Sequence, residues 1–243
     1  MKYALLSALL AVGCTDDNQS LTIARFVELT GTGGSCLADP ATTASVSSGL
    51  FDVKLGTTFG VGYLLGPVVR NNMLSIMTAS SPEMNDVYIN SFDIELKQDK
   101  GDSFLNGIAP ANLKFNLPSA AGLVTPGGGQ VATPIEVIPA GYVGMLQGVT
   151  QVPSVRPITV HLRSNGAHAG VTLSSSYSDF PVYLCDGCLL NRGNDFFTCP
   201  AKGIPTAQIQ QGSCNFVQDA DVTCCTSPTG LVCGPQVPVQ TGM

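Results

Sequence analysis

The chain has no tryptophan, only two histidines, and few charged residues, which make up 12% of its 243 residues. Lysine and arginine total eleven against seventeen acidic residues, which gives a formal net charge of −6, and the basic residues form no cluster. Because phosphate binding relies on clustered basic side chains, this distribution argues against nucleic acid as a partner. Beyond the N-terminus, no apolar run approaches the roughly 20 residues that a helix needs to cross a bilayer.

The common catalytic motifs are also missing from the sequence. It contains no G-x-S-x-G elbow, no H-E-x-x-H helix and no P-loop. Asp93 and Glu95 would share one face of a strand, but such pairs are typical of a solvated surface rather than of a glycosidase. The acidic stretches 99–102 and 219–221 lack the full calcium-loop pattern, and turns explain them. We therefore expect no enzyme activity and no cofactor.

Apolar and turn-forming residues are abundant. Hydrophobic residues make up 44% of the chain, which is enough for a sizeable core. With 27 glycines, 16 prolines and few strong helix formers, the composition favours short strands joined by turns. The predicted fold class is all-β, with an antiparallel β-sandwich or jelly-roll-like domain over residues 21–184 and a small disulfide-rich, loop-rich tail over residues 185–243.

Alternation of apolar and polar residues with period two predicts individual strands. Residues 51–55 and 112–117 alternate in this way, and Pro118 is expected to end the second run. Within residues 87–97 the apolar phase shifts by one residue, which predicts a β-bulge near Asn90 and Ser91. The glycine-rich stretch 125–130 is expected to be a loop or hinge, with one β domain favoured over two.

Asn165–Gly166 is a dipeptide preferred in a two-residue type I′ hairpin turn. With this turn, His161 and His168 would be diagonal neighbours on the polar face of the hairpin. These two residues are weak candidates for a metal site, which would still need a third ligand, and a solvated outer face explains them better. The opposite face would carry Ile158, Val160, Leu162, Ala169, Val171 and Leu173.

The first fourteen residues have the pattern of a secretion signal. Lys2 provides a positive start, residues 3–12 are apolar, and Gly13 is a small residue before Cys14. The sequence LLAVGC over residues 9–14 resembles the bacterial lipobox, although Ala11 replaces the leucine most often found there. The resemblance implies removal of residues 1–13, lipidation of Cys14 and a tether over residues 14–20. The alternatives are a buried N-terminal helix and a signal for soluble secretion.

With a β-rich domain and a cysteine-rich tail behind this signal, the chain resembles bacterial lipoproteins of unassigned function. The resemblance implies an extracytoplasmic location in the bacterial cell envelope, attached to the membrane through the N-terminal lipid anchor. Thr15 directly after Cys14 implies the outer membrane. The expected function is that of a non-catalytic surface or periplasmic protein that binds a protein or glycan partner or serves in envelope structure.

Eight further cysteines are candidates for disulfide bonds, and seven of them follow Leu184. The number in the tail is odd, so pairing all eight within one chain requires one tail cysteine to reach Cys36. Cys224 and Cys225 are adjacent and are expected to bridge two different partners, because neighbouring Cα atoms are too close for an ordinary disulfide. The candidates are Cys36, Cys185, Cys188, Cys199, Cys214, Cys224, Cys225 and Cys233.

Cys185 and Cys188 form a C-x-x-C motif, which supports an alternative function as an extracytoplasmic thiol-redox or metal-binding protein. A structural bridge is favoured, since Asn191 and Gly193 would interrupt the helix that activates a redox thiolate. A zinc site would need a second C-x-x-C or a histidine, and the tail has neither. Leu189 stands where c-type haem attachment requires histidine.

Overall fold

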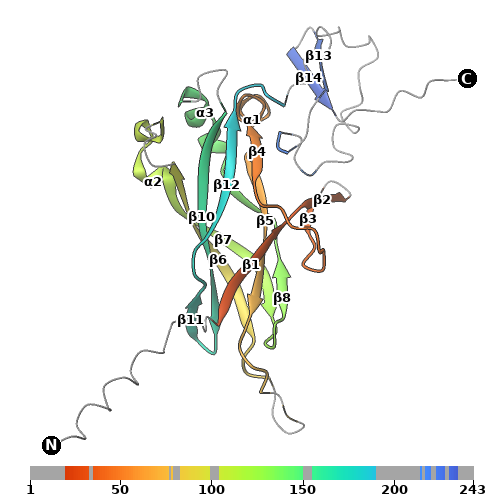
Figure 1. Cartoon of the computed structure of the whole chain (residues 1–243), viewed down its shortest axis with the longest axis vertical. Helices are drawn as coiled ribbons and strands as arrows, with labels where there is room; N and C mark the ends of the chain where they lie inside the picture. Colours follow the sequence, from red (N-terminus) through yellow and green to blue (C-terminus); the bar gives the residue numbers. More distant parts are fainter. Residues whose placement is uncertain are drawn as a thin grey trace, which may run out of the picture.

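The computed structural model describes residues 20–32, 35–76, 78, 83–98, 104–149, 155–189, 214, 217–219, 223–227 and 230–234. Strands dominate these residues, and almost all strand pairs are antiparallel (Figure 1). The β-rich class predicted from composition is therefore confirmed. Among the residues described, no helix has the length and apolar character to cross a membrane.

Two main sheets make up the β region. The first has the order β1-β5-β8, with β9 also pairing to β5. Its strands are β1 (Leu21–Val27), β5 (Tyr63–Asn71), β8 (Gln130–Ala132) and β9 (Ile135–Ile138). The second has the order β4-β12-β10-β6-β7, with β11 extending β10. Its strands are β4 (Gly49–Asp52), β12 (Ser178–Cys185), β10 (Arg156–His168), β6 (Val87–Gln98), β7 (Lys114–Val124) and β11 (Val171–Ser174).

Shorter elements complete the fold. One two-stranded pair joins β2 (Leu29–Thr32) to β3 (Ser35–Ala38), and another joins β13 (Thr223–Ser227) to β14 (Gly230–Gly234). The helical elements are α1 (Val53–Phe59), the 3-10 helix η1 (Phe104–Gly107), α2 (Pro110–Leu113) and α3 (Ala140–Val149). The three α-helices gather at one end of the long sheets (Figure 1).

Both main sheets contribute to one hydrophobic core. Val69 of β5, Ile94 of β6 and Val160 of β10 are each at most 1% exposed and belong to the same cluster of buried side chains. Alternate residues of β6 and β10 are buried, as expected for strands with one face toward the core. Leu189 and Val217 also belong to this cluster, so parts of the predicted tail pack on the β region.

The β-bulge predicted in β6 is confirmed. Toward β10 the adjacent residues Asn165 and Gly166 pair with Ser91 and Ile89, so Asn90 is the extra residue in β6. The register toward β7 also shifts between Ile89 and Ser91, but there the extra residues lie in β7, between Pro118 and Gly122. The extra residue restores one buried face along the strand. Consequently Val87 and Ile89 before the bulge, and Phe92 after it, are all buried in the core.

The hairpin turn predicted at Asn165–Gly166 is wrong. Strand β10 continues through both residues to His168, and the chain turns at Ala169 and Gly170, whose φ angles are 45° and 82°. Two positive φ angles are what a type I′ turn needs. Gly166 serves a different purpose, because a Cβ there would press on the Val87 side chain of β6.

The limits of both predicted strands also differ from those in the structure. The alternating run 51–55 is a strand only to Asp52, whose side chain caps helix α1, although Phe51 and Leu55 are both fully buried. The second run is a strand only from Lys114, because Asn112 and Leu113 belong to α2. Pro118 does not end it, since β7 continues to Val124. Strand β7 lies at the edge of its sheet, and proline is tolerated on an edge strand because the missing N–H breaks no ladder.

The glycine-rich stretch 125–130 forms the connection between β7 and β8, as expected of a loop. Its backbone is tied to the end of β5, because Gly127 N–H donates to the Met73 carbonyl and Gly128 N–H donates to the Asn71 carbonyl. A loop held in this way joins two strands that contribute to the same core. It does not separate two cores.

Candidate functional site

A short piece of the tail closes the gap between the two main sheets. Asp52 N–H of β4 donates to the Val217 carbonyl at 3.1 Å, and Asp219 N–H donates to the Leu50 carbonyl at 2.9 Å, so residues 217–219 pair with the free edge of β4. The side-chain amide of Gln218 meanwhile accepts from Leu64 N–H at 2.8 Å and donates to the Leu64 carbonyl at 2.9 Å. Gln218 therefore links β4 of one sheet to β5 of the other.

Beside this link lies a cavity of about 740 Å³, which we call the seam pocket. Small-molecule sites are usually clefts of about 300–1,000 Å³. The pocket takes side chains from both main sheets, from β2 and from the tail. Its lining is Val27, Glu28, Leu29, Val46, Ser48, Gly49, Leu50, Tyr63, Leu64, Leu65, Gly66, Val155, Tyr183, Cys214, Gln218 and Asp219.

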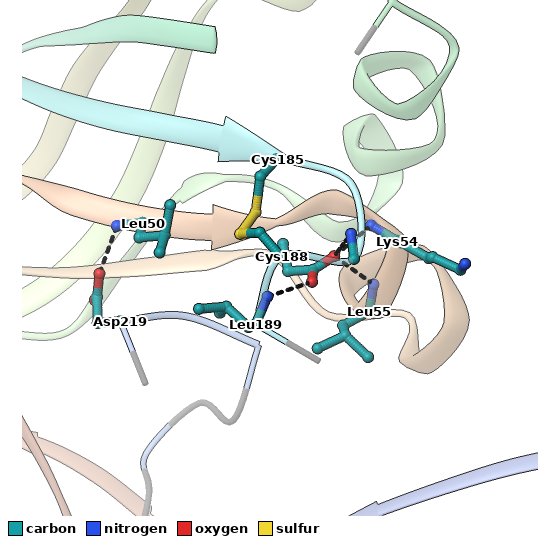
Figure 2. Close-up of a disulfide and its surroundings, with 9 residues drawn as sticks. Leu50, Lys54, Leu55, Cys185, Cys188, Leu189 and Asp219 are labelled. Carbon is teal, nitrogen blue, oxygen red and sulfur yellow. Dashed lines mark hydrogen bonds between the residues drawn. A yellow bond between two sulfur atoms is a disulfide. The ribbon is translucent and has the colours of Figure 1, made fainter. Parts of the chain in front are cut away.

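The polar centre of the seam pocket is the pair formed by Tyr63 and Asp219. The Tyr63 hydroxyl donates to Asp219 Oδ2 at 3.1 Å, Gln218 Nε2 donates to the same oxygen at 3.1 Å, and Leu50 N–H donates to Oδ1 at 2.6 Å. Burial and the Asp219 carboxylate raise the pKa of Tyr63 above its usual range, so the phenol keeps its proton. Figure 2 shows Asp219 directed at the Leu50 amide of β4.

Two carboxylates influence each other in the pocket. Burial raises the pKa of Asp219, the hydrogen bonds from Leu50, Tyr63 and Gln218 oppose that shift, and the charge of Glu28 adds to it. Glu28 is exposed, and its carboxylate forms no hydrogen bond or ion pair with any residue that the structure describes. Asp219 also has a left-handed backbone with φ of 61°, a conformation that costs energy for a residue other than glycine.

Gly49 allows this arrangement because it lacks a side chain. A Cβ built on Gly49 would overlap the Tyr63 hydroxyl. The absence of that atom lets the phenol lie against the backbone of β4, where it reaches Asp219. The aromatic ring of Tyr63 also packs edge-on against Phe51, with ring centroids 5.8 Å apart. The Tyr63 side chain is therefore held at its ring by Phe51 and at its hydroxyl by Asp219.

A second polar centre lies at the end of β12 (Figure 2). The fully buried carboxylate of Asp52 accepts four backbone hydrogen bonds. Two come from the first turn of α1, from Lys54 N–H at 3.0 Å and Leu55 N–H at 3.2 Å. Two come from the C-x-x-C loop, from Gly187 N–H at 2.8 Å and Leu189 N–H at 3.0 Å. Asp52 thereby joins the helix to the start of the tail.

The two cysteines of the C-x-x-C motif are joined in a disulfide beside this carboxylate. The Cα atoms of Cys185 and Cys188 lie 5.8 Å apart, and one carboxylate oxygen of Asp52 and the two sulfurs all lie within 4.8 Å of one another. Cys185 is buried, whereas Cys188 is exposed. While the sulfurs are bonded to each other they are not thiolates, so a metal could take them as ligands only after reduction.

A long-range disulfide joins Cys36 of β3 to Cys214, with Cα atoms 5.0 Å apart and a sequence separation of 178. It is a link of the kind that the odd number of tail cysteines requires for full pairing. Cys214 lines the seam pocket and stands shortly before the segment 217–219. In the β13–β14 pair, the backbone register sets Cys224 opposite Cys233.

His161 and His168 do not lie side by side, because both belong to the single strand β10. The His161 ring pairs with Asp179 of β12 and stacks on Tyr177, with ring centroids 4.1 Å apart. His168 Nδ1 lies 3.2 Å from the Asp86 carbonyl. The structure therefore does not bring the two histidines together as the expected hairpin would.

Asp93 and Glu95 share one face of β6, as predicted. Asp93 accepts from Arg163 Nε at 2.8 Å and from Asn116 Nδ2 at 2.7 Å. Partial burial raises the pKa of Asp93, but the hydrogen bonds from Asn116, Arg163 and Asn165 outweigh that effect and lower it. Glu95 lies 3.4 Å from Lys97. These acids balance neighbouring cations on the outer face of the sheet.

Several predicted positions lie outside the described residues. Among them are Cys14, Cys199 and the acidic stretch 99–102, and of the stretch 219–221 only Asp219 is described. Sequence reasoning missed the roles of Asp52 and Tyr63 altogether. The sequence signal for Asp52 was its position directly before an apolar run, because aspartate is a preferred N-cap residue at the start of a helix. The pairing of Tyr63 with Asp219 spans 156 positions and leaves no local pattern.

Comparison with protein-family models and with curated proteins finds no match to this chain. The conclusions about function therefore rest on the geometry of the two polar centres and on the sequence patterns.

Proposed function

We propose that the chain is a lipid-anchored, extracytoplasmic binding protein in which the two main sheets form a β-sandwich scaffold. Cys14 carries the anchor, and residues 14–20 tether the scaffold to the outer membrane of the cell envelope. The seam pocket is the binding site for a ligand or for part of a protein or glycan partner. The protein is non-catalytic.

The observation that supports binding is the seam pocket itself. Its size suits a small ligand or an inserted side chain, and it combines apolar walls with a few converging polar groups, as ligand sites usually do. The Cys36–Cys214 disulfide and the Gln218 link supply a rigid frame. A frame that is fixed before binding lowers the entropy cost of association.

Capture of envelope components by the full chain, purified in detergent and immobilised, tests the binding site. Ser48→Trp fills the pocket from an exposed lining position, and Thr172→Trp adds the same indole to an exposed position of β11 outside the lining. We expect the captured species to be lost with Ser48→Trp and kept with Thr172→Trp. Equal capture by both variants would exclude the seam pocket as the binding site.

Incorporation of labelled palmitate in a bacterial host tests the anchor. We expect the wild-type chain to take up the label and the Cys14→Ser variant to lose both the label and the membrane association. Uptake that is unchanged in Cys14→Ser would show that Cys14 is not the lipidated residue. This result would leave the binding site untouched, because the two parts of the proposal rest on different residues.

A thiol-redox function at Cys185 and Cys188 is the second candidate, and the exposure of Cys188 beside a buried carboxylate favours it. A substrate dithiol would attack the exposed sulfur and become a disulfide, while Cys185 and Cys188 take up the two electrons and two protons as thiols. Intact-mass measurement after alkylation, with and without a small dithiol at increasing concentration, tests this candidate. Resistance of the Cys185–Cys188 bridge to strongly reducing dithiol mixtures would mark it as structural.

A further inference from the structure

The seam pocket carries an unbalanced negative charge. Glu28 and Asp219 both line it, and the charge of Glu28 raises the pKa of Asp219, so the two carboxylates interact. No lysine, arginine or histidine is among the described residues that line the pocket. Elsewhere in the described structure, Asp93, Glu95 and Asp179 each lie beside a basic side chain. Glu28 and Asp219 have no such basic neighbour among the residues that the structure describes, and unlike the fully buried Asp52 they line a cavity.

The remaining surfaces of the pocket are suited to methylene groups and to a cation. Val155 at 50% exposure offers an apolar side chain, and Tyr183 at 41% exposure offers an aromatic ring. Apolar walls favour a hydrocarbon stem, and an aromatic face attracts an ammonium or guanidinium group. An anionic ligand would meet two like charges at close range, so charge complementarity excludes it.

Asp219 is held in position by donors from three elements. The donors from Leu50, Tyr63 and Gln218 occupy three of about four acceptor positions on its carboxylate, so about one position stays open to a ligand. A calcium ion prefers six to eight oxygen ligands, which two carboxylates already engaged in this way do not supply. A single charge-assisted hydrogen bond from an organic cation needs only the open position.

We propose that the seam pocket binds an organic cation, an ammonium or guanidinium group carried on an apolar stem. The cation is either a free amine or a basic side chain presented by a protein. This inference rests on the proposed binding function and specifies the chemistry of the same site. Glu28 and Asp219 face the charge, and the apolar walls contact the stem.

Calorimetric titration of the full chain in detergent tests the charge with matched probes. N-acetyl-lysine amide represents a protein side chain, and its uncharged counterpart is N-acetyl-norleucine amide. Putrescine represents a free amine, with butanediol as the neutral counterpart and succinate as the anionic one. We expect binding of N-acetyl-lysine amide or putrescine at least about tenfold tighter than binding of the neutral counterpart, and no binding of succinate. The stronger of the two cations identifies the source.

Charge-removing variants locate the interaction. Glu28→Gln and Asp219→Asn should each weaken cation binding by about tenfold, since each removes one charge-assisted contact while keeping an acceptor oxygen. Glu95→Gln removes one negative charge outside the pocket and should leave the affinity unchanged. Equal binding of charged and neutral probes, or unchanged affinity in both pocket variants, would overturn the inference.

The outcomes for the inference and for the binding function are separable. Equal binding of the charged and neutral probes, or binding of succinate, that is lost in Ser48→Trp would refute the preference for a cation and retain the pocket as a binding site. The cation is also refuted, and the pocket retained, if no probe binds while Ser48→Trp still abolishes capture of an envelope partner. If the Ser48→Trp variant captures the same envelope components as the wild-type chain and no probe binds, both the cation inference and the proposed binding site are refuted.

Discussion

Replacing Asp52 by alanine should strongly destabilise the chain, because this carboxylate joins the β region to the start of the tail. The substitution removes the cap of α1, which costs about 1 kcal/mol. It also leaves the Gly187 and Leu189 N–H groups buried without an acceptor, at about 1–3 kcal/mol each. The expected loss in the free energy of unfolding is therefore about 3–7 kcal/mol, a large part of the ~5–15 kcal/mol of a typical domain.

Urea unfolding followed by far-ultraviolet circular dichroism measures this loss, because the chain has no tryptophan to report by fluorescence. Asp186→Ala is the matched control. Asp186 belongs to the same loop, is half-buried, and makes no hydrogen bond or ion pair with any described residue, so its removal should cost less than about 0.5 kcal/mol. The loss of stability in Asp52→Asn should lie between those of Asp52→Ala and Asp186→Ala. The amide keeps one acceptor oxygen, but its NH₂ group then faces a backbone donor.

Unfolding of Asp52→Ala and Asp186→Ala at the same urea concentration, with the same dependence on urea, would contradict this structural role of Asp52. Such a result would mean that water or a shifted backbone satisfies the loop N–H groups once the carboxylate is gone. An unchanged dependence on urea is itself part of the expectation, since this slope follows the surface exposed on unfolding. A changed slope would indicate that the tail had detached before the main transition.

Two further predictions concern the seam pocket. Binding of N-acetyl-lysine amide should weaken as the pH falls, because protonating Asp219 removes a charge that the ligand uses. Burial and the charge of Glu28 raise the pKa of Asp219 above 3.8, against the hydrogen bonds from Leu50, Tyr63 and Gln218, so the loss of binding should begin above that pH. Asp219→Asn should abolish this part of the pH dependence. An affinity that is constant down to about pH 4 would contradict the assignment. The paired substitution of Cys36 and Cys214 by serine opens a loop of 178 residues, which costs up to about 5 kcal/mol by the loop-entropy relation. It should weaken cation binding even while circular dichroism reports a folded chain, and full affinity in this variant would show that the bridge does not shape the pocket.

The strands with one buried face could be predicted from the sequence, because burial of alternate residues leaves a period of two. The bulge at Asn90 was predictable for the same reason, since an inserted residue keeps Ile89 and Phe92 on one face. The turn was not. Asn165–Gly166 has strong turn chemistry, but Gly166 is a glycine because β6 approaches it closely, and that contact is invisible in the local sequence.

The candidate site was harder to predict than the fold. Glu28, Tyr63 and Asp219 come from three distant parts of the chain, and none of them belongs to a motif. In the sequence, Asp219 is only one acid of a short acidic stretch. Its significance depends on a backbone bridge from the tail to β4 and on a glycine that admits a phenol, and both are consequences of tertiary packing.

If the chain is exported as proposed, the bridge between Cys36 and Cys214 has a consequence for the order in which its cysteines become oxidised. In a chain that crosses the membrane N-terminus first, Cys36 emerges 178 residues before its partner Cys214. Three other cysteines emerge between them, namely Cys185, Cys188 and Cys199. Closure of the three-residue span between Cys185 and Cys188 removes two of these competitors at once, since short loops close faster than long ones. The small ring beside Asp52 would thus leave fewer free thiols to compete with Cys214 for Cys36.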